Sequence, residues 1–451
     1  MRIVQLSTSD IQGGAARAAH RLAQGLRRAG HDCAMLVKQK SSADDWVISF
    51  GVLDPAREEA AAQVWKHYIH DQRSALSKTH FSLPIPGYDI SAHPLIQSAD
   101  IIHLHWVAGF LRPADIGRLQ RLGKAVVWTL HDQRPFTGGC HYSAGCRQFE
   151  TFCEQCPQLR SDEAGLVLAA FQEARAQWLP EFGVICLSRW MAECARQSAI
   201  LGKARIEIIP NGLDTDVFRP GRAAARQKLG WVAGAIYFLF GADYVEEQRK
   251  GFAVLRAAIL LCLKNKTFRE GVAAGRINFV FFGEPPESAE LGFPARSLGR
   301  IAAESALAEI YAAADAFMLP SHEDNLPNTM LEAMCCGTPV IGSAVGGIAD
   351  TIRHLENGLL APAGDEREFA AHMQRIVTDD ALRARLSDAC AQTVPAAFSL
   401  ARQAERCVKF YGEEMTRLKP SATPPPPSAF VLPPVPPPAQ TGAWRRLRSL
   451  F

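Results

Sequence analysis

The 451-residue sequence has no long apolar runs and only a small excess of charge. Because it contains no run of about 18 or more apolar residues, we expect no segment to span a bilayer. A net charge of +3 is small for this length and argues against nucleic acid as an obligatory partner. The opening residues, MRIVQLSTSD, lack the charged and apolar regions of a signal peptide. Without such a signal, the 12 cysteines favour a reducing cytoplasm, with thiols or a bound metal in place of disulfides.

Alternating apolar runs and helical patterns recur along the chain and indicate an α/β protein with parallel sheets. The chain is too long for one ordinary core, so we expect two doubly wound domains, at 1–210 and 211–398. Turn-forming residues at 210–212 mark the boundary. Such domains would face each other across a cleft, with ligands at the carboxyl ends of the strands. The expected strands are 2–7, 33–38, 101–105, 125–130, 184–188, 206–209, 235–241, 277–283, 316–320 and 339–344.

A helical pattern resumes over 399–418, and the composition changes beyond Lys419. Ten of the 28 prolines fall between Pro420 and Pro438, so 419–451 is expected to be a disordered or polyproline spacer. The spacer ends in WRRLRSLF, which could rest on an anionic membrane as a short amphipathic helix. A solvated tail with no partner is the alternative.

The segment 321–347, SHEDNLPNTMLEAMCCGTPVIGSAVGG, carries polar residues between an apolar strand and a helix. The helix start points free N–H groups and a positive dipole end beyond the strand, which suits a phosphate. Asp324 near the helix entrance and Glu332 inside the helix could accept hydrogen bonds from sugar hydroxyls. An ordinary βαβ unit with a polar loop is the alternative reading.

Two further loops contain residues that suit a diphosphate. Gly13 and Gly14 follow the first strand, where small residues allow close approach of a pyrophosphate, although the spacing is not the dinucleotide fingerprint. Arg249 and Lys250 follow the strand 235–241 and could clamp a diphosphate, Arg249 by its planar fork and Lys250 as a point charge. Tight-turn glycines and solvated cations are the alternatives.

His131 lies at the end of the strand 125–130, with His105 similarly placed after an earlier strand. A histidine facing a cleft could orient a hydroxyl, although it could equally be a core or rim residue. The basic segment 112–124 could present a positive face to lipid phosphates or a lipid-diphosphate acceptor, or be an ordinary solvated helix.

Four cysteines gather in the loop 136–160: Cys140, Cys146, Cys153 and Cys156. Four thiolates in so short a loop could bind a tetrahedral structural zinc, although only the Cys153–Cys156 pair has the spacing of a zinc knuckle. Redox pairing and plain packing remain as alternatives.

These motifs together resemble those of retaining glycosyltransferases of family 4 (group 1), which have the GT-B fold. The resemblance covers roughly residues 1–418. Segment 321–347 is similar to the family's nucleotide-sugar signature, with Asp324 where the first of two glutamates usually stands and Glu332 as the second. The glycine loop and the Lys250-Gly251 pair also resemble those of the family, and the cysteine-rich loop resembles that of a subset of its bacterial members.

The resemblance implies transfer of a hexose from a UDP- or GDP-sugar to a hydroxyl of a glycan or lipid-linked acceptor, with retained anomeric configuration. It implies no catalytic metal or other cofactor, so zinc would be structural only. It also implies surface or extracellular polysaccharide assembly by a cytoplasmic protein, peripheral at the inner membrane face. The implied catalytic residues are His131, Arg249, Lys250 and Asp324. The implied donor-binding residues are Gly13, Gly14, Arg249, Lys250, Asn325, Asn328, Thr329 and Glu332.

Two other functions remain open from the sequence. A sugar-nucleotide epimerase shares the two-domain fold, but the pattern at Lys250 and Glu332 speaks against it. A non-catalytic scaffold could use the cysteine-rich loop and the proline tail to bind partners, but the adjacent Arg249 and Lys250 argue against that role.

Overall fold

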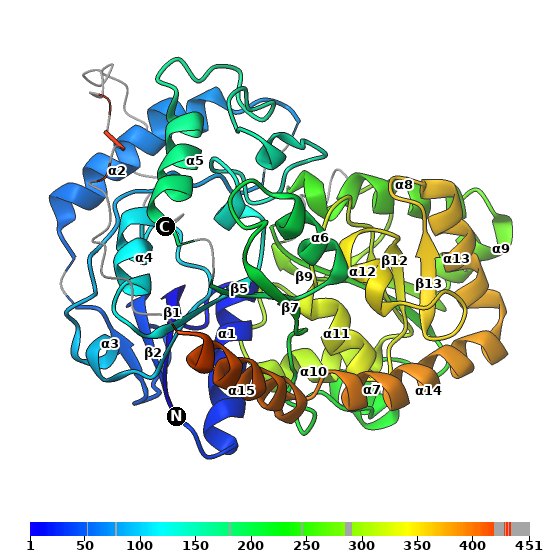
Figure 1. Cartoon of the computed structure of the whole chain (residues 1–451). Helices are drawn as coiled ribbons and strands as arrows, with labels where there is room; N and C mark the ends of the chain where they lie inside the picture. The colour runs from blue at the N-terminus through cyan, green and yellow to red at the C-terminus, as the bar shows by residue number, and fades with distance from the viewer. Residues whose placement is uncertain are drawn as a thin grey trace.

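Figure 1 shows the computed structural model of the chain, in which two parallel β-sheets lie side by side with helices packed around them. The described residues are 1–51, 53–76, 79–179, 182–244, 247–284 and 291–418, together with Ser428, Phe430, Val431 and Pro433. This is the α/β arrangement with two parallel sheets that the sequence predicts.

The first sheet has seven parallel strands in the order β3-β2-β1-β4-β5-β6-β7. Neighbouring residues of each strand pack on opposite faces. Ile3 belongs to a cluster with the closing helix, whereas Val4 joins a cluster that contains Trp128. Because both faces are covered, the central strands are near-continuous apolar runs. The strands are β1 (Arg2–Ser9), β2 (Asp32–Gln39), β3 (Val47–Ser49), β4 (Ile101–Leu104), β5 (Ala125–Leu130), β6 (Gly183–Cys186) and β7 (Arg205–Ile208).

The second sheet has six parallel strands in the order β10-β9-β8-β11-β12-β13. Its strands alternate in the same way, with Phe238 and Leu239 in different hydrophobic clusters on the two faces. The strands are β8 (Ile236–Tyr244), β9 (Ile277–Glu284), β10 (Arg296–Ser297), β11 (Ala316–Leu319), β12 (Val340–Ser343) and β13 (Gly358–Ala361).

The helices mostly follow the strands in alternation along the chain. Those around the first sheet are α1 (Gly14–Arg28), α2 (Pro55–Tyr68), α3 (Pro94–Ser98), α4 (Pro113–Gln120), α5 (Leu166–Gln177) and α6 (Arg189–Gln197). The later ones are α7 (Arg222–Leu229), α8 (Phe252–Cys262), α9 (Lys266–Ala273), α10 (Glu304–Ala313), α11 (Asn328–Cys335), α12 (Gly346–Thr351), α13 (Glu366–Thr378), α14 (Asp380–Ala397) and α15 (Leu400–Arg417). Among the helices of the described residues, none is both long and apolar enough to cross a bilayer.

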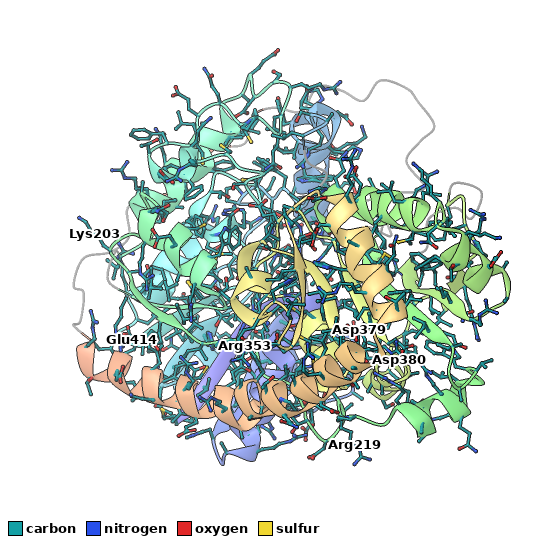
Figure 2. All side chains as sticks on the ribbon, turned by 90° about the vertical axis from the view of Figure 1, so that its right-hand side faces the viewer. Lys203, Arg219, Arg353, Asp379, Asp380 and Glu414 are labelled. Atoms are coloured by element: carbon teal, nitrogen blue, oxygen red, sulfur yellow. The ribbon has the colours of Figure 1, made fainter. Side chains whose placement is uncertain are left out.

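Helix α15 returns from the second sheet to the first. In Figure 2, α14 and α15 follow one another along one side of the molecule, with Asp380 towards one end and Glu414 towards the other. Ser399 caps α15 by accepting a hydrogen bond from the Arg402 N–H, 3.3 Å away. At its far end the Tyr411 hydroxyl lies 2.7 Å from His103 Nδ1 on β4. The helix thus connects the second sheet to the core of the first sheet.

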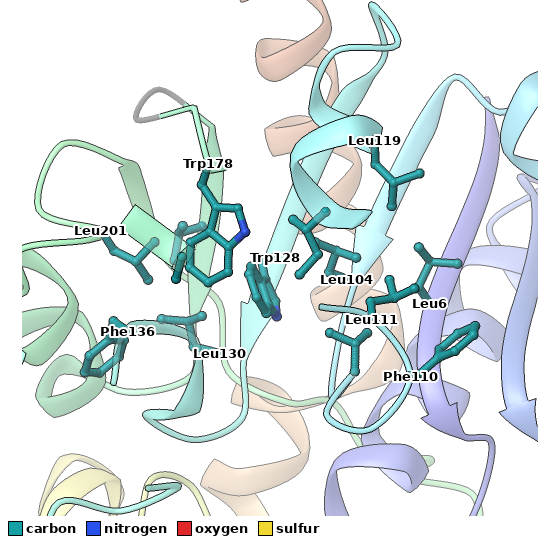
Figure 3. Packing of buried hydrophobic residues seen from close by; sticks show 14 of the residues in the cluster. Leu6, Leu104, Phe110, Leu111, Leu119, Trp128, Leu130, Phe136, Trp178 and Leu201 are labelled. Carbon is teal, nitrogen blue, oxygen red and sulfur yellow. The ribbon is translucent and has the colours of Figure 1, made fainter. Parts of the chain in front are cut away.

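The core of the first sheet reaches the region where β4 and β5 end. Figure 3 shows Trp128 and Trp178 side by side among leucine and phenylalanine side chains, and their rings meet edge to face with centroids 5.1 Å apart. Both indole N–H groups are satisfied, because Trp128 donates to the His105 carbonyl and Trp178 to the Pro113 carbonyl. The packing therefore fixes the backbone of His105.

The basic segment 112–124 is largely built into the fold. Most of α4 is buried, and Asp115 accepts from both Arg112 and Arg118. Lys124 Nζ donates to the carbonyls of Gln97 and Ala99. Most of the cations that could have formed a lipid-facing surface therefore have partners inside the protein.

The proline-rich tail and its basic end, 444–451, lie outside the described residues except for four positions. Of these, Ser428 Oγ donates to Glu173 Oε1 over 2.7 Å, and Phe430 packs against the core of the first sheet.

Candidate active site

Segments that follow strands of both sheets meet at one place. The side-chain amide of Asn325, after β11, donates to the Leu130 carbonyl at the end of β5, 2.9 Å away. Ser188, after β6, donates to Asn325 Oδ1 over 2.7 Å. Asn328 Nδ2 donates to the Gly14 carbonyl, after β1, over 2.8 Å. The polar loop of segment 321–347 therefore lies against the carboxyl ends of the first sheet, which is where ligands bind in such folds.

A charged cluster occupies the side of this junction that belongs to the second sheet. Lys250 Nζ lies 2.8 Å from Asp324 Oδ2, and Arg249 Nη1 lies 3.0 Å from Asp324 Oδ1. Asp324 is only 4% exposed. Burial opposes its ionisation, but Lys250 and Arg249 outweigh that effect and hold its pKa below the usual value. The sequence-predicted Arg249, Lys250 and Asp324 thus form one ionised group.

Two glycines allow the backbones of this cluster to approach each other. Gly251 has φ +71°, and a Cβ there would lie 1.8 Å from the Pro320 carbonyl oxygen. Gly346 has φ +48°, and a Cβ there would lie 1.7 Å from the Asp324 carbonyl oxygen. No side chain fits at either position, so the Lys250-Gly251 and Gly346-Gly347 pairs are needed to hold Lys250 and Asp324 in contact.

The start of α11 lies beside the glycine loop. Its N-cap is Pro327, its first turn contains no acidic residue, and no side chain of the described residues caps its first N–H groups. Asn328 and Thr329 are half-buried at this end. Across from them, Gly13 has φ +86° and no atom lies within 4 Å of where its Cβ would be. A helix N-terminus facing open glycine backbone is suited to an anion such as a phosphate.

Glu332 lies in a buried network that joins the two halves of the molecule. Its Oε1 lies 2.8 Å from Arg21 Nη2, and its Oε2 accepts from the Tyr311 hydroxyl at 3.1 Å. Arg21 comes from α1, is 2% exposed and also pairs with Glu304. Its Nη1 is buried without a hydrogen-bond partner. Glu332, predicted to bind the donor, is therefore already paired with an arginine from the opposite sheet.

The predicted His131 lies at the end of β5, in contact with a second histidine. His131 Nε2 is 3.0 Å from His105 Nδ1, and its backbone carbonyl accepts from Asn325 Nδ2 at 3.1 Å. Burial lowers the pKa of His131 to about 4, so the ring is neutral at pH 7. A neutral ring can orient a hydroxyl by hydrogen bonding.

Asp132, next to His131, is the centre of a second polar network. His141 Nδ1 and Trp106 Nε1 lie 2.7 and 2.9 Å from Asp132 Oδ2. The other His141 nitrogen lies 2.8 Å from Ser82 Oγ. Burial works against ionisation of Asp132, but His141 together with N–H donors lowers its pKa. These contacts anchor the residue that follows His131.

The four clustered cysteines line one small cavity beside Phe81 and Gly139. All are free thiols, and burial raises the pKa of Cys153 to about 12 and that of Cys140 well above its usual value. In the part of the chain that the structure describes, no three or more His, Cys, Asp or Glu side chains are arranged to hold a metal ion. Structural zinc stays a prediction, which metal analysis of protein purified without chelator would test.

Three residues of the junction were not singled out from the sequence: Arg21, Tyr142 and Glu323. Tyr142 places its ring 4.0 Å from the Arg249 guanidinium carbon, and Glu323 Oε2 accepts from the Ala144 N–H at 3.0 Å. A signal existed for Arg21, which is a charge on the helix face it shares with Ala18 and Gly25. The other two contacts join distant segments and leave no local pattern.

Two family models match the chain. The model described as "Glycosyltransferase Family 4" matches residues 12–217, and the one described as "Glycosyl transferases group 1" matches residues 235–379. A D-inositol 3-phosphate glycosyltransferase from Stackebrandtia nassauensis is 31% identical over 227 residues, which are 47% of this chain and 50% of that protein. The same enzyme from Acidothermus cellulolyticus is 29% identical over 306 residues, 64% of this chain and 61% of that protein. The chain thus matches about half the length of the first of these relatives.

Solved structures share the fold at low sequence identity. Sucrose-phosphate synthase from Thermosynechococcus elongatus has a TM-score of 0.62 at 19% identity, covering 92% of this chain and 100% of that one. Anabaena HepE in complex with UDP-glucose has a TM-score of 0.61 at 15% identity, covering 91% and 99%. WaaG, a glycosyltransferase involved in lipopolysaccharide biosynthesis, has the same TM-score, identity and coverage. The two family models and the two-sheet fold together establish that the chain belongs to the family 4, group 1 glycosyltransferases.

Proposed function

We propose that the chain transfers a hexose from a UDP- or GDP-sugar to a hydroxyl of a glycan or lipid-linked acceptor, with retention of the anomeric configuration. The observation that carries this proposal is the convergence of three features that suit a phosphate. Lys250, the uncapped start of α11 and the open Gly13-Gly14 backbone come from both sheets and meet at one junction. Residues 1–210 would hold the acceptor and residues 211–398 the donor.

The donor diphosphate would lie against Lys250 and the first N–H groups of α11, beside Asn328 and Thr329. The Lys250 side chain is 23% exposed, and among the described residues its ammonium donates one hydrogen bond, to Asp324, so it retains donors for phosphate oxygens. Arg249 is more fully engaged, because Glu247, Asp324 and the Glu323 carbonyl already accept from it. Lys250 would therefore make the direct phosphate contact, with Arg249 adding positive charge behind it.

The sugar hydroxyls of the donor would bind to the two carboxylates. Asp324 would accept from the hexose and Glu332 from the ribose, as the family resemblance implies, with Asn325 shaping the loop between them. Each Glu332 oxygen already accepts a hydrogen bond, from Arg21 or Tyr311, and an oxygen has a second lone pair to offer. HepE, which shares the fold, is known in complex with UDP-glucose, and this supports a nucleotide-sugar donor.

The chemical step would be a displacement on the front face of the hexose. The bond from the acceptor oxygen to C1 forms on the face from which the C1–phosphate bond breaks, and the acceptor proton passes to the leaving phosphate. Lys250 and the α11 N–H groups would stabilise the charge that develops on the diphosphate. A neutral His131 would orient the acceptor hydroxyl. No metal is needed in this scheme, because the cations and the helix start supply the positive field.

The cellular role proposed here is assembly of surface or extracellular polysaccharide at the inner face of the cytoplasmic membrane. WaaG, with a similar fold, is involved in lipopolysaccharide biosynthesis. The basic end of the tail would then supply a weak, peripheral membrane contact.

The proposal is tested by incubating the purified full chain with a panel of UDP- and GDP-sugars. We expect release of nucleoside diphosphate from at least one donor and a rise in melting temperature with that donor. NMR of the product made with an added acceptor should show the anomeric configuration of the donor. Absence of both turnover and a melting shift across the panel would contradict the proposal.

A further inference from the structure

The cysteine-rich loop, 136–160, reaches across the junction to the donor side. Hydrogen bonds within the first domain hold the part of the loop around Tyr142 in place. Gln158 Nε2 donates to the Tyr142 carbonyl over 2.6 Å, and the Ser143 N–H donates to Gln133 Oε1 over 2.6 Å. Behind the tip, the four cysteines line their common cavity. The loop therefore presents Tyr142 in a defined position instead of as a mobile surface residue.

Tyr142 covers one face of the Arg249 guanidinium. The guanidinium carbon lies 4.0 Å from the ring centroid, well inside the range of a cation–π contact. The Tyr142 hydroxyl is 3.5 Å from Asp324 Oδ1, at the outer limit of a hydrogen bond. On these distances the ring, and not the hydroxyl, makes the significant contact with the charged cluster.

The remaining contacts of Arg249 are made through its N–H groups, which lie in the plane of the guanidinium. Nε donates to Glu247, and Nη1 reaches both Asp324 Oδ1 and the Glu323 carbonyl. The Tyr142 ring against the Arg249 guanidinium excludes water from that side and restrains rotation of the guanidinium, while its N–H groups keep their hydrogen bonds. The same loop secures the neighbouring carboxylate, because Ala144 N–H and Ser143 Oγ both donate to Glu323.

We propose that Tyr142 is a positioning residue of the donor site, which holds Arg249 on Asp324 by covering the face of its guanidinium. The cysteine-rich loop is then the part of the first domain that completes the charged cluster of the second. This inference rests on the proposed function for its catalytic consequence, but the Tyr142–Arg249 contact itself does not.

The kinetic test uses the full chain and a donor that the wild type hydrolyses. Tyr142→Leu removes the ring face and is expected to lower kcat about tenfold with little change in KM, as fits a misplaced cluster. Tyr142→Phe keeps the ring and should stay within about twofold of the wild type, since the long hydroxyl contact adds little.

The matched control is Tyr88→Leu: Tyr88 and Tyr142 are 7% and 8% exposed, and Tyr88 bonds to Glu58 in the first domain. Tyr88→Leu should lower the melting temperature but leave kcat unchanged.

The structural test is a double-mutant cycle on melting temperature with Tyr142→Leu, Arg249→Gln and the double variant. The sum of the melting-temperature losses in the two single variants is expected to exceed the loss in the double variant, because both single changes remove the same contact. If Tyr142→Leu melts too low to assay, Tyr142→Met replaces it in both tests. Additive losses in the cycle overturn the proposal, as does wild-type kcat in Tyr142→Leu or an equal loss in Tyr142→Phe. The cycle needs no turnover, so it decides on Tyr142 even if the donor panel contradicts the proposed function.

Discussion

The charged side chains of the junction are largely buried and contact one another. Asp324 is the counterion of both Lys250 and Arg249, and the side chains of these two cations are 23% and 10% exposed. Removing one member of such a group leaves a buried charge without its partner, which costs far more than loss of an exposed ion pair. The cluster is therefore sensitive to charge and less sensitive to exact side-chain length.

This sensitivity predicts different outcomes for two substitutions of Asp324. Asp324→Asn removes the counterion and should destabilise the protein by about 3 kcal/mol and lower kcat/KM for donor hydrolysis about 100-fold. Asp324→Glu keeps the charge and should remain within about tenfold of the wild type. Thermal melting and donor kinetics measure the two effects, and wild-type kcat/KM in the Asn variant would show that the charge is not used.

The backbone beside Lys250 gives a second prediction. Gly251→Ala must push the chain away from the Pro320 carbonyl and should separate Lys250 from Asp324, with loss of most activity. Gly230→Ala is the matched control. Gly230 has φ +65° but nothing within 4 Å of its Cβ position, so this variant costs only the backbone strain, about 1 kcal/mol. Equal activity in the two variants would mean that the close approach at Gly251 has no role.

Local sequence signals account for Lys250, Asp324 and the glycines, because each stands directly after a strand or at a helix start. They do not account for Tyr142, whose partner lies more than 100 positions away, or for the pairing of Arg21 with Glu332. Those contacts exist only because the two sheets meet in the fold, and the residues next to each one in the sequence do not indicate its partner.

Three histidines lie on strand β4 or directly after strands β4 and β5, and their rings contact one another. His103 lies between Thr129 Oγ1 and the Tyr411 hydroxyl, its ring 4.2 Å from that of His105. Burial lowers the pKa of His103 to about 3 and that of His131 to about 4. These rings are neutral in the folded state and become protonated near pH 6.5 only on unfolding.

Stability should therefore be lost as pH falls below about 6.5, because the unfolded chain then binds more protons than the folded one. His103→Gln removes one such site, so the free energy of unfolding of this variant should fall less steeply between pH 6.5 and 5. At the acid end, its slope should be smaller than that of the wild type by about 1.4 kcal/mol per pH unit. Urea unfolding at several pH values measures both slopes. Parallel slopes for the wild type and the variant would mean that His103 is protonated in the fold.

The elements themselves were predicted best where they are buried on both faces. All ten predicted strands occur, with ends shifted by at most three residues. The three strands that the pattern missed, β3, β10 and β13, are short and lie at sheet edges. With only three, two and four residues, these strands offer too few positions for an apolar run to stand out.

At the scale of the whole molecule, the two sheets are joined by polar contacts, by α15 and by Leu187, which packs in a hydrophobic cluster of the second sheet. The second sheet contributes Asp324, Asn325 and Glu332 to the junction, and the first contributes Gly14, Arg21 and Tyr142. Neither half contains a complete site. The proposed donor cleft is thus a property of the assembled chain.

The central claim is that this cleft binds the diphosphate of a nucleotide sugar through Lys250. The most direct test is the rate of nucleoside diphosphate release by the full chain, compared with Lys250→Gln and with Lys228→Gln. Lys228 is an exposed lysine paired with Glu309 away from the junction, and it serves as the control. We predict a loss of about 100-fold or more in kcat/KM for Lys250→Gln and none for Lys228→Gln. Equal release by the wild type and Lys250→Gln would contradict the account.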